Sequence, residues 1–148
     1  MAASAWKVYH EAKKYLLTAD LDLDAGLVRV KLVSGASAAV VSDFTKSAFT
    51  SAGTGIPILL SGATKVRTPT NLSIRNSSNS AVVLDFDSVI FTASAALNSI
   101  LYAVIGVSGG KALAWTKLTS SGVITLTAGS TLTITPNAAV FSITGGTT

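Results

Sequence analysis

The densest group of carboxylates in this chain is a set of three aspartates at alternate positions, Asp20, Asp22 and Asp24. Acids at this spacing open the calcium loop of helix–loop–helix proteins, which also needs Gly at its sixth position and a bidentate Glu at its twelfth. Ala25 and Lys31 occupy those positions here. We therefore predict no metal site and interpret the aspartates as water-facing residues of an edge strand. A cation shared between subunits remains the alternative.

Two further acids, Asp85 and Asp87, alternate with Phe86 in an apolar run and so share one face of an expected strand. A paired-carboxylate glycosidase needs two acids on opposite sides of a cleft, usually from different elements. Acids two residues apart on one strand more often pair with basic residues across the sheet. The basic residues expected to be available are Arg67, Arg75 and Lys117.

The remaining chemistry-bearing residues are isolated in the sequence. His10 is the single histidine and there are no cysteines, so neither a zinc site nor a catalytic triad can be built around it. We predict no catalytic residue, no cofactor and no enzymatic activity. A glycan-binding module that uses Trp115 or Tyr102 is an alternative, and it would need these rings to be exposed beside polar groups.

The composition predicts one folded domain with an unusually neutral surface. The chain has 148 residues and is 49% hydrophobic, but only 12% of its residues are charged, compared with about 25% in typical proteins. Ser, Thr, Ala and Gly must then cover much of the surface, which favours burial against neighbouring subunits. The net charge is +4, but the basic residues are scattered, so we expect no direct nucleic-acid binding. No apolar run approaches the roughly 18 residues of a membrane span.

The first third of the chain combines two periodicities. Residues 5–17 place Trp6, Tyr9, Ala12 and Leu16 at helical spacing, which predicts a helix within residues 1–18. The segment 19–33 then alternates with period two, as a half-buried strand does.

Short apolar runs fill the remainder of the chain, separated by Gly, Ser, Asn and Pro, with turns expected at 120–122, 128–129 and 136–137. The threonines at alternate positions within 125–135 are expected on the hydrated face of a sheet. The short runs favour a mainly β fold, an antiparallel β-sandwich or jelly roll over residues 19–144, followed by a loose tail at 145–148. A long Ser/Thr-rich loop is expected at 45–56. The strands are expected at 38–44, at 81–92 as the strongest, at 99–107 buried on both faces, at 111–118, and at hairpin spacing at 123–127, 131–135 and 139–143.

Several segments resemble a family of small virion proteins of tailed bacteriophages. The segment YHEAKKYLL at 9–17 is similar to the leading "YxxAxxxLL" helix of that family, and DLDLDAGLVRVKLV at 20–33 is similar to its "DIDLDTDTIKVAL" strand. Later segments with a similar order are AVVLDFDSVIFTAS at 81–94, SILYAVIG at 99–106 and GSTLTITPNAAVFSIT at 129–144.

The resemblance implies a non-enzymatic structural protein, most simply a capsid decoration or cement protein. Such a protein is assembled in the host cytoplasm, binds the outside of the shell between major capsid protein subunits, and forms a homo-oligomer, a dimer or trimer. The helix would then act as a clamp, so that removal of residues 1–17 leaves the β-domain folded. A tail or adsorption component is the alternative. The expected contact residues are Trp6, Tyr9, Lys13, Leu16, Leu17 and Phe49.

Overall fold

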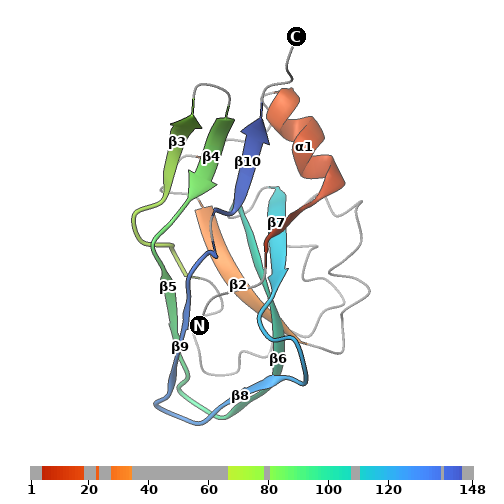
Figure 1. Ribbon diagram of the computed structural model, residues 1–148. Coiled ribbons are helices and arrows are strands. Elements are labelled where there is room, and N and C mark those ends of the chain that lie inside the picture. Colours follow the sequence, from red (N-terminus) through yellow and green to blue (C-terminus); the bar gives the residue numbers. More distant parts are fainter. Residues whose placement is uncertain are drawn as a thin grey trace.

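The computed structural model has a mainly β architecture with one short helix and antiparallel strand pairing (Figure 1). This confirms the mainly β fold preceded by a short helix. The residues that the structure describes are 5–18, 23, 28–34, 67–78, 81–107, 111–137 and 139–144.

The helix α1 spans His10–Leu17 and follows a two-residue strand, β1, at Lys7–Val8. The prediction of a helix from residue 5 is therefore wrong at its start. Lys7 and Val8 pair with the strand β7, and the N–H of Tyr9 donates to the carbonyl of Leu113 at 3.0 Å. Because these backbone groups are used by the neighbouring strand, helical bonding begins only at His10.

The largest sheet has five strands. Four of them lie in the order β1-β7-β6-β2, and β8 pairs with the first residues of β6. The central strand of this sheet is β6, Leu97–Val107, and every residue from Ile100 to Val107 is buried. This confirms the prediction of a strand covered on both faces. The flanking strands are β2 at Val28–Ser34, β7 at Ala112–Lys117 and β8 at Ile124–Leu126.

The two smaller sheets correct the prediction of one long strand at 81–92. This segment forms β4, Ala81–Asp85, and β5, Val89–Thr92, in different sheets. At the break, the N–H of Thr70 donates to the carbonyl of Ser88, and the N–H of Asp87 donates to the carbonyl of Thr70. Thr70, which precedes β3, therefore bonds to the N–H of Asp87 and the carbonyl of Ser88. In a continuous strand, these two groups would be available to a neighbouring strand. The partner strands are β3 at Ser73–Ser78 and β10 at Phe141–Thr144 for β4, and β9 at Thr131–Ile134 for β5.

The pairings are nested, because β4 pairs with β10, β5 with β9 and β6 with β8. The chain thus runs out along β4–β6, turns through β7, and returns along β8–β10. Although β8, β9 and β10 follow one another at hairpin spacing, they pair with β6, β5 and β4 and not with one another. Their turns are as predicted, with Gly122 and Gly129 at φ of 66° and 83°, where glycine avoids strain.

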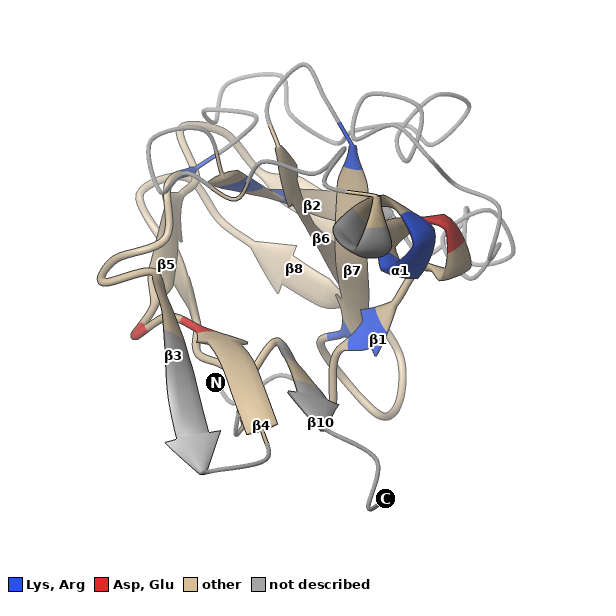
Figure 2. Ribbon diagram, turned by 90° about the horizontal axis from the view of Figure 1, so that it is seen from above, with Lys and Arg blue, Asp and Glu red and all other residues tan. Residues whose placement is uncertain are grey.

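Buried residues from all three sheets form one hydrophobic core. Figure 2 shows β3, β4 and β10 on one side of the molecule and β2, β6 and β7 on the other, and Leu84, Val30 and Ile105 are all completely buried in the same cluster. In β9, Leu132 and Ile134 are buried, whereas the alternating threonines face outward. This confirms the expected hydrated face of the late strands.

Candidate binding surface

One transverse row of the five-stranded sheet carries a lysine at each end. Lys31 of β2 lies opposite Val104 of β6, Val104 lies opposite Trp115 of β7, and Trp115 lies opposite Lys7 of β1. Residues directly opposite one another in antiparallel strands share a face of the sheet. The four residues therefore lie on one face, which we call the Trp115 face.

At the β1 end of this row, the Trp115 ring is enclosed by a cation and a second ring. The Nζ atom of Lys7 lies 4.9 Å from the centre of the Trp115 ring. The Tyr102 ring meets it edge to face, with 5.7 Å between centres and 75° between planes. Trp115 is half-buried, Tyr102 is buried, and Lys7 is exposed. A cation over an indole ring at an exposed site contributes about 0.5–1 kcal/mol, so Lys7 is held over Trp115 only weakly.

At the β2 end of the row, Lys31 is 2% exposed, and Val33 on the same face is 1% exposed. Burial lowers the pKa of the Lys31 ammonium group to about 8, because the charged form loses hydration. The prediction of a half-buried strand is therefore wrong here. Val30 and Leu32 on one face of β2 are buried, and so are Lys31 and Val33 on the other face.

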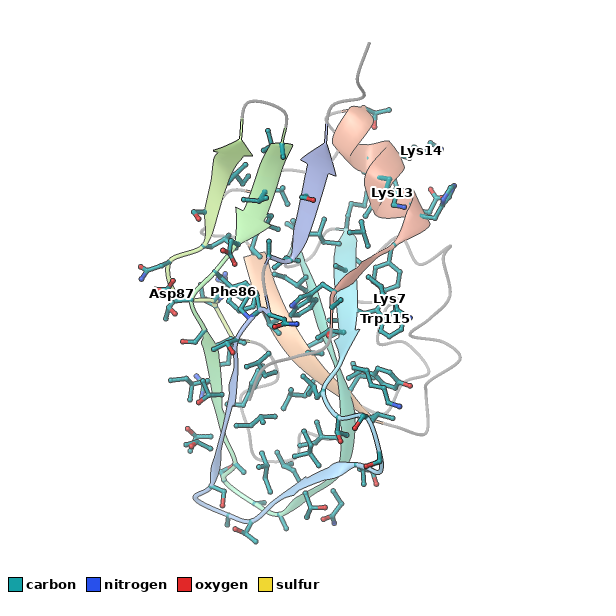
Figure 3. All side chains as sticks on the ribbon, viewed as in Figure 1. Lys7, Lys13, Lys14, Phe86, Asp87 and Trp115 are labelled. Atoms are coloured by element: carbon teal, nitrogen blue, oxygen red, sulfur yellow. The ribbon has the colours of Figure 1, made fainter. Side chains whose placement is uncertain are left out.

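The helix extends the basic side of the molecule. Lys13 and Lys14 are exposed on α1, and Figure 3 places them on the same side as Lys7 and Trp115. Tyr15 is half-buried, and the Nζ atom of Lys111 lies 4.2 Å from the centre of its ring. The helix therefore presents two exposed lysines and the ring of a second lysine–aromatic contact.

The acids Asp85 and Asp87 lie away from these lysines. Figure 3 places Asp87 on the side of the molecule opposite Lys7 and Trp115. The Asp85 Oδ1 atom accepts a bond from the Phe86 N–H at 2.9 Å, and the Asp87 Oδ2 atom accepts one from the Asn71 side-chain amide. For Asp87, this contact replaces the predicted cross-strand pairing with a basic residue. Both carboxylates stabilise the break between β4 and β5.

Two of the residues predicted to contact a partner belong to the chain's own core. Trp6 is 8% exposed and Tyr9 is 1% exposed, and the Trp6 ring packs edge to face against Phe86, with 6.1 Å between ring centres. The assignment of Trp6 and Tyr9 to an external contact is corrected accordingly. Removal of residues 1–17 would take both rings from the core, so we now expect this deletion to destabilise the β-domain.

The other predicted contact residues divide into two groups. Lys13 is exposed, as a contact residue should be. Leu16 and Leu17 lie within α1, but their side chains are outside the described part of the structure, as is all of Phe49.

The predicted absence of a metal site can be examined only in part. The segment with Asp20, Asp22 and Asp24 lies outside the described residues. Within residues 5–18, 23, 28–34, 67–78, 81–107, 111–137 and 139–144, no three His, Cys, Asp or Glu side chains come together as metal ligands. No helix in these ranges is long and apolar enough to cross a membrane.

The arrangement around Trp115 bears on the glycan-binding alternative. A sugar would need an open ring face to stack on, but Lys7 lies over Trp115, and Tyr102 is only 8% exposed. Sequence reasoning placed Lys7 on a helix and therefore missed its contact with Trp115. No local pattern could have indicated it, because the two residues meet only through the pairing of distant strands.

Lys7 thus lies over one half-buried tryptophan, and Lys13 and Lys14 are exposed on the same side of the molecule (Figure 3). No protein-family model, curated protein or solved structure matches this chain.

Proposed function

We propose that this chain is a non-enzymatic structural protein of a tailed-phage virion, a decoration or cement protein that binds the outer shell between major capsid protein subunits. The observation that carries the proposal is the order of elements. A short helix is followed by antiparallel strands. Of these, β4, β5, β9 and β10 fall within the segments that resemble the phage family, and β2 and β6 overlap them. On this proposal, the protein is assembled in the host cytoplasm and is located on the capsid exterior.

The nested strand pairing supports the finer fold assignment in this proposal. We propose that the ribbon formed by β4–β6 and β8–β10 folds over the core as a jelly roll or closely related sandwich, which are common architectures of capsid domains. Such a fold places many short strands in a rigid unit. Rigidity suits a protein that must hold neighbouring shell subunits at fixed positions.

The described surface supports association in many copies. It displays threonines and serines, and also four large apolar side chains that are between 39% and 54% exposed: Ile74, Val82, Ile90 and Val123. Surfaces with little charge and several exposed apolar groups favour contact with neighbours. On a fixed lattice, many weak contacts give strong total attachment. A homo-oligomer, a dimer or trimer, would provide such repeated contacts.

The copy number in purified particles tests this proposal. Quantitative mass spectrometry would compare this chain with the major capsid protein in the same particles. A ratio near one, or a simple fraction of one, is expected for a shell-coating protein. A ratio tens of times lower would assign the chain to the tail, and absence from particles would refute a virion role.

A further inference from the structure

We propose that Lys7, Lys13, Lys14 and the Trp115 ring form a docking surface for a carboxylate-rich protein surface. If the proposed function is correct, this surface faces acidic residues on the outside of the shell. We call these four residues the lysine docking surface. The inference identifies the chemistry of the partner and the side of the chain that meets it.

Charge is the first reason for an acidic partner. All three lysines are exposed, and Glu11, the one acid among residues 5–18, is half-buried. Figure 2 shows basic residues on α1 and β1 beside one acidic position on α1, further basic residues on β2, and Asp on the far side near β3 and β4. The whole chain also carries a net charge of +4. Complementary charge increases the rate of encounter and sets the orientation of docking.

Trp115 is the second reason, because it provides an apolar centre within the charged surface. Tryptophans inside a ring of polar contacts are common hot spots of protein interfaces. Trp115 is half-buried and is braced by Tyr102, so its orientation is fixed before binding. A carboxylate that pairs with Lys7 would bring the partner surface directly to this ring.

The third reason is that the backbone holds the docking surface in place. β1 pairs with β7 through Lys7 and Val8, and the N–H of Tyr9 bonds to the carbonyl of Leu113. Ala12 is completely buried, which fixes α1 against the core. Because these elements are already ordered, docking would cost little conformational entropy.

Two other occupants fit the surface less well. Single-stranded nucleic acid needs open aromatic faces on which successive bases stack, but Tyr102, the ring beside Trp115, is buried. A second copy would have to offer carboxylates, yet the one exposed acid among the residues that the structure describes, Asp87, is bonded to Asn71. The test below includes both as outcomes.

The experiment measures binding of the full chain to fluorescent poly-L-glutamate at low and moderate salt. The test variant is Lys7→Gln, Lys13→Gln and Lys14→Gln together. The matched control is Thr92→Glu, Ser120→Glu and Thr125→Glu, at three exposed positions away from α1 and β1. Each triple variant lowers the formal net charge by three units from +4, that is, to +1. Thermal melting is measured for both, to show that they remain folded.

We expect the wild-type chain and the control to bind poly-L-glutamate with similar affinity. We expect the lysine variant to bind on the order of tenfold more weakly, because three surface ion pairs are lost. The difference should shrink as added salt shortens the screening length. Trp115→Ala should also weaken binding while all three lysines are kept.

Three results would overturn the inference. Equal losses in the two triple variants would mean that only net charge matters. Tighter binding to an oligo-dT of equal charge would indicate nucleic acid. Self-association of the wild-type chain that the lysine variant lacks, with no poly-L-glutamate binding, would indicate a second copy. None of these measurements uses particles, so failure here is separate from failure of the copy-number test of the proposed function.

Discussion

The two ends of one row in the five-stranded sheet place the same residue type in opposite environments. Lys31, at the β2 end, is buried and has a lowered pKa, whereas Lys7, at the β1 end, is exposed and lies over Trp115. Each lysine has an apolar residue on either side of it in the sequence. The difference therefore comes from what covers each end of the sheet. The same face acts as core at one end and as a candidate docking surface at the other.

Substitution of the two tryptophans is expected to give the largest change in the free energy of unfolding, and it tests the same contrast between a buried and a partly exposed side chain. Trp6→Ala should lower the free energy of unfolding by about 3–5 kcal/mol, because a large ring is removed from the core. Trp115→Ala should cost clearly less, since that ring is half-buried. Urea denaturation followed by circular dichroism would measure both. Equal losses of unfolding free energy would contradict the distinction between a core tryptophan, Trp6, and a half-buried one, Trp115.

A pH series tests the buried end of the row. The pKa of Lys31 is about 8 in the folded chain and 10.5 as the ordinary value. Between these values the unfolded chain binds more protons than the folded chain, so stability should rise with pH. The expected rise is on the order of 1–3 kcal/mol, because a tenfold change in proton affinity corresponds to about 1.4 kcal/mol.

The matched variant for the pH series is Lys31→Met. Urea midpoints of the wild-type chain and the variant would be compared at several values between pH 7.5 and 10.5, and the difference isolates Lys31 from other titrating groups. The rise should be absent in the variant. A wild-type stability that falls relative to the variant over this range would contradict the burial of a charged Lys31.

The carboxylates on the far side should show a smaller effect. Asp87→Ala removes the acceptor of the Asn71 amide and should lower the free energy of unfolding by about 1 kcal/mol, the typical contribution of a hydrogen bond. Thr125→Ala, at an exposed position of β8, is the control and should change stability by less than about 0.5 kcal/mol. If the two variants are equally stable, Asp87 does not hold the break between β4 and β5.

The smallest effect is expected at the exposed end of the row. Lys7→Ala should lower stability by about 0.5 kcal/mol, the loss of an exposed cation–ring contact. Acrylamide should also quench Trp115 emission more strongly, because the ring is uncovered. Measurements in a Trp6→Phe background isolate Trp115, and Lys7→Arg is the control that keeps the cation. Unchanged quenching in Lys7→Ala would contradict the contact.

Local sequence patterns predicted the elements better than their partners. The continuous apolar run at 99–107 indicated a strand buried on both faces, and β6 confirms it. The alternation around Leu132 and Ile134 likewise indicated the hydrated face of β9. Glycines at 122 and 129 marked turns correctly. In each of these cases the cause lies within a few neighbouring residues.

The errors share a different origin, because they depend on distant segments. The helix starts late since β1 pairs with β7, and the run at 81–92 is broken since Thr70 bonds at Ser88. The burial of Lys31 and the contact of Lys7 with Trp115 also arise from strand pairing. Helical periodicity predicted an apolar face at Trp6 and Tyr9. Both residues are buried although they precede α1, and the periodicity could not distinguish the core from an external contact.

The nested pairing of β4–β6 with β8–β10 has a consequence for synthesis of the protein. The partner of β4 is β10, at Phe141–Thr144, so the outermost pair cannot form on the ribosome until residue 144 has emerged. The innermost pair, β6 with β8, can close much earlier. Folding rates fall as contacting residues become more distant in the chain. During translation, the open β4 edge must therefore be kept from pairing with nascent neighbours, a risk that grows when many copies are made together.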